Sequence, residues 1–192
     1  MIELSYPYTE EKVRALKAGD AVALTGRVYT GRDKFHKYFA DGGPLPVDFT
    51  DGALYHCGPV VLPDGAGWRV VAAGPTTSVR ENPYEPDFIA RSGVRVVIGK
   101  GGMDEATLAA MKKHGCVYIQ AVGGAAALSA ASVVRVAGVS LLDAFGAAEA
   151  VWHFDVKGFR GVVAMDARGN SLFARVREAS AERLRTLLGA RR

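Results

Sequence analysis

Three short segments of the chain carry cationic or hydroxyl side chains just after an apolar, strand-like run. The first, residues 30–37 (TGRDKFHK), leads from such a run into a sequence with helical spacing. Backbone N–H groups at a strand-to-helix turn attract anions, and Arg32 there can bind a carboxylate through two parallel hydrogen bonds. His36 follows four residues later, so on a helix it shares a face with Arg32. A solvated basic helix start with a surface histidine would explain the same pattern.

The second segment, residues 74–80 (GPTTSVR), follows the apolar run at 70–73. Its three consecutive hydroxyls, together with Arg80, form a dense set of donors for an anion, with Thr76 and Thr77 at their start. A threonine hydroxyl is a poor base at neutral pH, so it could move a proton only if another group activates it. A hydroxyl-rich turn with local side-chain to backbone bonds is the alternative interpretation.

The third segment, residues 98–104 (IGKGGMD), is a glycine-rich loop between a strand-like run and a helical one. Its glycines let the backbone approach a ligand, and Lys100 adds a point charge. The spacing matches neither the Walker phosphate loop nor the dinucleotide-binding fingerprint. A plain glycine-rich connector is the alternative here.

Ligands of α/β sheets collect outside the carboxyl ends of the strands. We therefore expect Arg32, Arg80 and Lys100 to meet around a doubly charged anion. The chain shows no carboxylate pair, no metal-spaced histidine set and no Ser-His-Asp order, which disfavours hydrolase and zinc chemistry. We predict no metal ligand in this chain.

The elements that must position these segments follow from hydrophobic periodicity and turn residues. Strands that alternate with helices predict an α/β fold with a mixed sheet and flanking helices, and a length of 192 residues fits a single domain over 1–192. The runs at 53–57 and 68–73 are expected to be neighbouring strands. The other expected strands are 21–29, 94–98, 116–122, 148–156, 161–167 and 171–176, and the expected helices are 9–19, 32–40, 87–91, 104–114, 123–136 and 180–188.

Composition sets the broad class of protein. Hydrophobic residues make up 49% and charged residues 23%, as in a soluble globular domain. No apolar stretch approaches the length of a membrane span, and the N-terminus does not have the pattern of a signal peptide, so we expect a cytoplasmic protein. A net charge of +4 suits anionic partners without indicating nucleic acid. Two cysteines, Cys57 and Cys116, are too few to hold an iron–sulfur cluster.

Several strings in the chain resemble class I fumarases. They are TGRDKFHK, GPTTSVR, NPYEPDFI, VVIGKGGM, EAVW and the late DARGNSL. The resemblance is to the C-terminal domain of these enzymes, or to the separate β subunit of fumarase and L-tartrate dehydratase. It covers about residues 19–172, and GPTTSVR followed by GKGGM is its most specific part.

The resemblance implies a swivelling β/β/α domain and a partner α subunit that holds a [4Fe–4S] cluster through three cysteines. It also implies that the cluster's open iron acts as a Lewis acid on the substrate hydroxyl, and that neither cysteine of this chain binds the cluster. Thr76 matches the residue that moves the C3 proton, and His36 matches a second catalytic candidate, with Lys100 also in the catalytic set. The positions that match binding of the dicarboxylate are Arg32, Thr76, Thr77, Arg80 and Lys100.

The function implied is reversible hydration of fumarate to L-malate by a hetero-oligomer, active only with the iron–sulfur subunit. This chain, when isolated, could form a homodimer. The sequence departs from the family pattern where Glu81 replaces a Met and Phe35 replaces a small residue. TGRD, in place of the TCRD associated with tartrate enzymes, favours fumarate. An L(+)-tartrate dehydratase β subunit and a non-catalytic dicarboxylate-binding module remain as alternatives.

Overall fold

The computed structural model describes residues 1–189 and is built on a seven-stranded mixed sheet in the order β1-β2-β3-β6-β7-β9-β8. A separate hairpin joins β4 and β5. The strands are β1 (Ile2–Ser5), β2 (Ala21–Thr30), β3 (Ala53–Tyr55), β4 (Val60–Asp64), β5 (Gly67–Ala72), β6 (Val96–Gly99), β7 (Val117–Gln120), β8 (Val133–Ser140) and β9 (Val151–Met165).

The sheet closes on itself because β2 pairs with both β3 and β9. The ring β2-β3-β6-β7-β9 therefore has an inside and an outside, and alternate residues of each strand face one or the other. Tyr55 and Ile98 belong to one apolar core, whereas their neighbours Leu54 and Val97 belong to the other. This explains why the short strands read as continuous apolar runs in the sequence.

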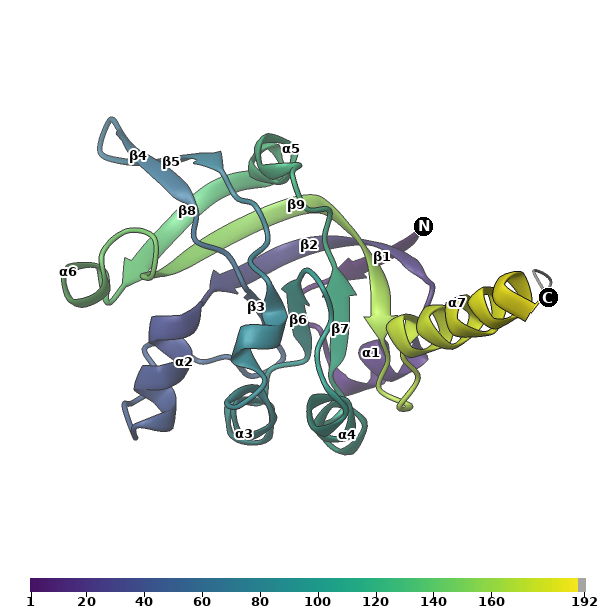
Figure 1. Cartoon of the computed structure of the whole chain (residues 1–192). Helices are drawn as coiled ribbons and strands as arrows, with labels where there is room; N and C mark the ends of the chain where they lie inside the picture. The colour runs from purple at the N-terminus through teal and green to yellow at the C-terminus, as the bar shows by residue number, and fades with distance from the viewer. Residues whose placement is uncertain (190–192) are drawn as a thin grey trace.

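Helices cover the outside of the ring on one side, as Figure 1 shows for α2, α3 and α4. Phe35 of α2, Phe88 of α3 and Met111 of α4 are fully buried in the outer core. These findings confirm the predicted α/β fold with a mixed sheet and flanking helices. The helices are α1 (Glu10–Ala15), α2 (Asp33–Ala40), the 3₁₀ helix η1 (Ser78–Glu81), α3 (Glu85–Ser92), α4 (Glu105–His114), α5 (Ala126–Ala131), α6 (Leu142–Phe145) and α7 (Leu172–Gly189).

Four local predictions were wrong. The strands expected at 148–156 and 161–167 are one continuous strand, β9. The run at 68–73 is not a neighbour of β3, because β5 pairs with β4 while β3 lies between β2 and β6. The expected helix at 123–136 is the short helix α5 followed by β8, and β8 pairs with β9. The expected strand at 171–176 is the beginning of α7. In each case tertiary pairing or helix continuation overrides a short apolar pattern.

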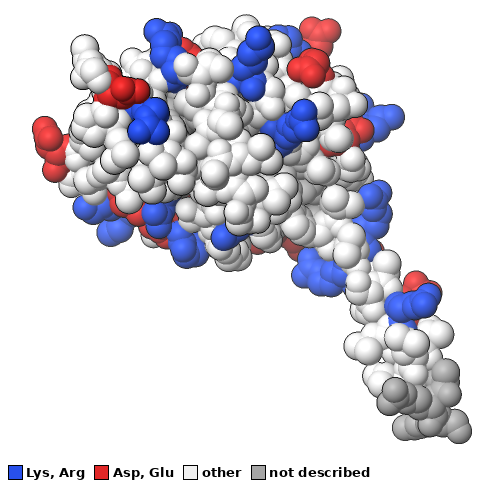
Figure 2. Space-filling view, turned by 90° about the horizontal axis from the view of Figure 1, so that it is seen from above, with Lys and Arg blue, Asp and Glu red and all other residues white. Residues whose placement is uncertain are grey.

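Helix α7 extends away from the body of the protein, as Figures 1 and 2 show. It has no buried residue, and Val176, Leu184 and Leu188 are exposed along it. Within residues 1–189, no helix combines the length and apolar character needed to cross a membrane.

Strands β2, β3, β6 and β7 run parallel, so their carboxyl ends meet at one edge of the sheet. Residues 30–37 follow β2, and Lys100 follows β6, as the sequence predicts. A third strand end, that of β3, leads into His56. This edge is where the candidate side chains gather.

Candidate active site

Arg32 lies between the end of β2 and the first residue of α2. Its side chain is 25% exposed, and its Nε lies 3.4 Å from a carboxylate oxygen of Glu149. Gly58 packs so closely that a β-carbon there would collide with the guanidinium. The arginine is therefore held in place while part of its surface still faces solvent.

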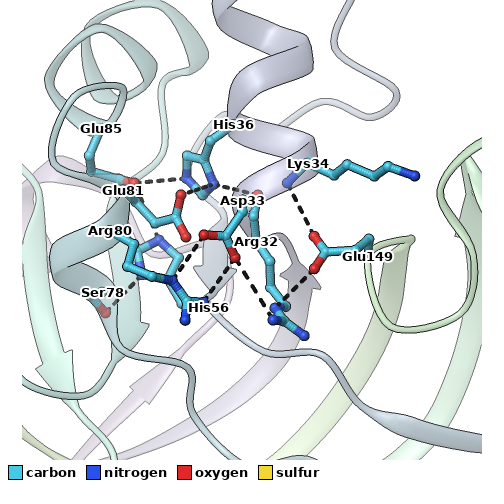
Figure 3. Close-up of polar contacts among 10 residues, drawn as sticks. All are labelled: Arg32, Asp33, Lys34, His36, His56, Ser78, Arg80, Glu81, Glu85 and Glu149. Carbon is cyan, nitrogen blue, oxygen red and sulfur yellow. Dashed lines mark hydrogen bonds and ion pairs between the residues drawn. The ribbon is translucent and has the colours of Figure 1, made fainter.

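Arg80 and Asp33 form a bidentate ion pair, with Nε and Nη2 of the arginine each 2.9 Å from a different carboxylate oxygen. Both side chains are 46% exposed. Asp33 also lies 3.8 Å from Nη2 of Arg32, so one carboxylate links the two arginines, as Figure 3 shows. Two arginines that are distant in the sequence thus lie side by side.

The turn that carries Thr76 is placed by main-chain hydrogen bonds to the ends of β3 and β6. Thr76 N–H donates to the carbonyl of His56 at 2.6 Å, and Lys100 N–H donates to the carbonyl of Thr76 at 3.2 Å. Ser78 N–H in turn donates to the carbonyl of Lys100 at 3.0 Å. The turn therefore lies beside Lys100, although the strand that precedes it is not part of the main sheet.

The remaining predicted donors at this edge are Thr77 and the side chain of Lys100. Thr77 forms a β-bridge with Lys100, and both residues are partly exposed. Among the ion pairs found within residues 1–189, none includes Lys100. The main chain thus places the Thr76–Arg80 turn beside Lys100, and Asp33 joins Arg80 of that turn to Arg32.

His36 does not face this surface. It belongs to α2 and is fully buried. Its Nδ1 lies 2.9 Å from the carbonyl of Arg32, and its Nε2 lies 2.9 Å from Oε2 of Glu85. A carbonyl and a carboxylate both accept, so both ring nitrogens must donate and the ring is an imidazolium. Burial alone would lower the pKa of His36, but the hydrogen bond and charge of Glu85 outweigh it and raise the pKa. The catalytic role expected for His36 stays a prediction.

His56 continues the buried network behind the site. Its Nε2 lies 3.2 Å from Oε2 of Glu85, and its Nδ1 lies 2.9 Å from Oγ of Ser78. Ser78 Oγ also lies 2.9 Å from the hydroxyl of Tyr118. Burial lowers the pKa of His56, which favours a neutral ring. Tyr118 then donates to Ser78, Ser78 donates to Nδ1 of His56, and the Nε2–H of His56 donates to Glu85.

The two carboxylates in this network have opposite pKa shifts. Burial would raise the pKa of Glu85, but the two histidines lower it to about 2. Glu81 is also buried, and neither of its oxygens has a hydrogen-bond partner within residues 1–189. Burial raises the pKa of Glu81 to about 7, and its Oε2 lies 3.4 Å from Nδ1 of His36. Glu81 is therefore poised to exchange its proton near neutral pH.

Two sets of side chains could in principle hold a metal. The ligand atoms of His36, His56 and Glu85 lie within 4.8 Å of one another, but the hydrogen bonds described above already account for each of these atoms. Cys57 and Cys116 are both buried and belong to the two different cores, inside and outside the ring. The cysteines of this chain therefore do not fit an iron–sulfur cluster.

Sequence reasoning did not single out the residues that hold this edge together, which are Asp33, His56, Ser78, Glu85, Tyr118 and Glu149. The polar histidine directly after the apolar run at 53–55 was a usable signal, because strand ends at a ligand-binding edge often carry functional groups. Nothing in local spacing connects Glu85 or Glu149 with this edge. Their contacts join residues that are 29 to 115 positions apart in the chain.

The chain is similar to several known proteins. The family model described as "Fumarase C-terminus" matches residues 1–176. The chain belongs to this family. A Geobacillus stearothermophilus protein that carries the name of a class I fumarate hydratase is 51% identical over 185 residues, or 96% of this chain. The chain spans only 36% of that relative's length.

Two further relatives are close to this chain in length. A Methanocaldococcus jannaschii protein that carries the name of an L(+)-tartrate dehydratase subunit beta is 40% identical over 94% of this chain and 95% of its own length. The L(+)-tartrate dehydratase subunit beta of Escherichia coli (strain K12) is 35% identical over 94% of this chain and 90% of its own length.

Proposed function

We propose that the chain is the β subunit of a hydro-lyase that reversibly hydrates fumarate to L-malate. The observation that carries this proposal is the convergence of Arg32, the Thr76–Arg80 turn and Lys100 at one edge of the sheet. A dicarboxylate presents two planar anions, which suit guanidinium forks, and Lys100 supplies a further positive charge. The name of the relative from Geobacillus stearothermophilus supports fumarate as the substrate.

The ion pairs of the free chain leave room for such a ligand. Arg80 contacts Asp33 through Nε and Nη2, so its Nη1 hydrogens remain for another acceptor. Asp33 and Glu149 orient the two arginines but neutralise only part of the charge, because Lys100 adds to it. The pairs thus preorganise the guanidinium groups, which reduces the entropy lost when a substrate binds.

The proposal includes a partner subunit that carries a [4Fe–4S] cluster, because the two buried cysteines of this chain do not fit one. The names of the relatives that contain "subunit beta" support a second subunit. The cluster would supply a Lewis acid for the substrate hydroxyl. The substrate would lie between the two subunits, within a hetero-oligomer.

The chain's own residues would then bind and orient the substrate and handle one proton. Arg32, Arg80 and Lys100 would hold the two carboxylates and stabilise the negative charge that develops on the carbon next to one of them. Thr76 would carry the proton at that carbon. Because a threonine hydroxyl is a poor base, an acidic group of the partner subunit would have to activate it.

The test is turnover of the complex of this chain co-expressed with a cluster-bearing partner subunit. Lys100→Ala and Thr76→Ala are each expected to lower kcat by at least about 100-fold, the scale for losing an oxyanion donor or an acid–base group. Lys113→Ala is a matched control, because Lys113 is an exposed lysine at the far end of α4. Near-normal turnover of either site variant would remove that residue from the mechanism.

The second candidate is the β subunit of L(+)-tartrate dehydratase. The observation in its favour is that the two relatives of matching length both carry that name. Assays of the same complex with fumarate and with L-tartrate separate the two substrates. A colourless chain that purifies without a partner and binds malate without turnover would instead indicate a dicarboxylate-binding module.

A further inference from the structure

Glu85 occupies a central position behind the candidate site. It is the first residue of α3 and is completely buried. One of its oxygens, Oε2, accepts hydrogen bonds from Nε2 of His36 at 2.9 Å and from Nε2 of His56 at 3.2 Å. Figure 3 shows Glu85 in contact with the ring of His36.

Each of the two histidines is in turn bound to a different part of the anion site. Nδ1 of His36 donates to the main-chain carbonyl of Arg32 at 2.9 Å. The ring of His56 accepts from Ser78, and its main-chain carbonyl accepts from Thr76 N–H. The loop after β2 and the turn before η1 share no main-chain hydrogen bond with each other within residues 1–189. The main chain joins them through the end of β3, where Gly31 N–H donates to the carbonyl of Tyr55 and Thr76 N–H donates to the carbonyl of His56. The buried carboxylate adds a side-chain link behind that strand end.

We propose that Glu85 is a positioning residue that fixes the Arg32 loop and the Thr76–Ser78 turn relative to each other through His36 and His56. This role rests on the proposed function of the site, although the link itself is a property of the folded chain. Glu85 lies behind His36 and His56 and does not contact the substrate. It acts by keeping the donors at the spacing that a dicarboxylate requires.

The link requires a carboxylate. A carboxylate oxygen can accept two N–H groups at once, and its charge compensates the buried imidazolium of His36. An amide at this position would have only one acceptor oxygen, uncharged, and would bring an NH₂ group close to ring N–H groups. His36 would lose its counter-ion and become neutral. A neutral ring has a single N–H, which cannot donate to both the carbonyl of Arg32 and the side chain of residue 85.

The first experiment compares wild type and Glu85→Gln in the full complex. We expect kcat/KM to fall about 10- to 100-fold, the scale for displacing reacting groups by up to about 1 Å. The pH at which KM begins to rise should be lower in the variant than in wild type, because burial lowers the pKa of His36 once the charge of Glu85 no longer raises it. The other titratable groups that face His36 are Glu81 from η1, His56 after β3 and Tyr84 before α3, and all remain in the variant.

A second measurement reports on the link without using activity. In wild type, the ¹⁵N spectrum of His36 should show two ring N–H groups above pH 6.5, where an ordinary histidine has lost one. In Glu85→Gln the same ring should release its proton at a lower pH. An unchanged titration of His36, or stoichiometric zinc in the wild-type chain that is lost from the variant, would overturn the proposal.

A second variant, Gly99→Ala, disturbs the link at Ser78, which donates to His56, and changes no titratable group. A β-carbon at Gly99 would collide with Oγ of Ser78 and come within 3.0 Å of the Tyr118 hydroxyl. Gly99→Ala should therefore displace Ser78 and raise KM at least about fivefold, without the pH dependence of Glu85→Gln. Gly67→Ala is the control, because the nearest atom to its new β-carbon is 3.8 Å away.

The outcomes separate this inference from the proposed function. If the wild-type complex turns over neither fumarate nor tartrate, the function fails, yet the titration of His36 still tests the link. If the complex is active and Glu85→Gln retains wild-type kcat/KM at every pH, the positioning role is wrong. A loss of folding in Glu85→Gln would leave Gly99→Ala as the test, and wild-type kinetics of that variant would overturn the role.

Discussion

The buried and exposed halves of the site differ in how their charges are compensated. His36 and Glu85 lie completely inside the protein and form three hydrogen bonds there, with each other, with the carbonyl of Arg32 and with His56. Arg80 and Asp33 form an equally short ion pair, but both side chains are 46% exposed. Removing one partner of a buried pair leaves an uncompensated charge, whereas water solvates the charge that remains when an exposed pair is broken. We call His36, Glu85 and their buried partners the buried layer, and Arg32, Asp33, Arg80 and Lys100 the exposed layer. An ion pair should therefore contribute to stability in the buried layer and to ligand binding in the exposed layer.

The largest effect on stability is expected for His36→Asn. It removes the imidazolium and leaves the carboxylate of Glu85 buried with only His56, which should cost about 3–5 kcal/mol in the free energy of unfolding. Urea unfolding of the isolated chain at pH 7 measures this cost. Lys37→Ala on the same helix is the control, because Lys37 pairs only with the exposed Asp41. A loss below about 1 kcal/mol for His36→Asn would show that the two layers do not differ.

The second prediction concerns the pH dependence that Glu81 adds to the buried layer. The pKa of Glu81 is raised from 4.5 to about 7 in the folded protein, so the unfolded chain releases this proton first as the pH rises. Its contribution to stability is therefore present below pH 4.5 and is lost between about pH 4.5 and 7. The difference amounts to at most about 3 kcal/mol at 1.36 kcal/mol per pKa unit.

Glu81→Gln isolates this contribution, because it keeps the shape of the side chain and removes the titration. The variant should gain stability relative to wild type as the pH rises from 5 to 7.5, in urea unfolding at both pH values. The raised pKa of His36 adds a loss of stability at higher pH in both proteins, and this loss begins at a lower pH in Glu81→Gln because the charge of Glu81 helps to raise the pKa of His36. A constant difference between the two proteins across this range would mean that Glu81 is already ionised at pH 5.

The exposed layer could be predicted from the sequence more fully than the buried one. Arg32 and Lys100 follow strands of the main sheet, and parallel strands end at one edge, so their meeting follows from a general rule. Thr76 reaches the same edge for a different reason. The run before it pairs in the hairpin of β4 and β5, and only main-chain bonds to His56 and Lys100 place the turn.

The buried layer could not be read from local patterns, because its contacts depend on tertiary packing. Glu85 is 49 residues from His36 and 29 from His56, and an acidic residue at the start of a helix is ordinarily explained by the helix dipole. Helix α7 shows a similar limit. The mostly apolar residues at 172–176 suit a strand, but they form the start of helix α7. This helix has few contacts with the rest of the described chain, mainly with β9.

The smallest effect on stability is expected for Asp33→Asn. Because the pair with Arg80 is exposed, its loss should change the free energy of unfolding by less than about 1 kcal/mol, and less in high salt. Its effect on activity should be larger. Asparagine offers one acceptor oxygen where the carboxylate offers two, so Arg80 loses its bidentate support and the link to Arg32. We expect kcat/KM of the complex to fall at least about 10-fold.

Asp41→Asn provides the matched control for that variant, because it removes a different exposed carboxylate, one that pairs with Lys37 on the same helix. It should alter neither stability nor turnover by more than the error of measurement. If Asp33→Asn and Asp41→Asn behave alike in the assay, Asp33 does not orient the arginines, and the exposed layer is an ordinary charged surface. If Asp33→Asn instead destabilises the isolated chain as much as His36→Asn does, exposure is not what separates the two layers, because the pair would then act as a structural link despite its contact with water.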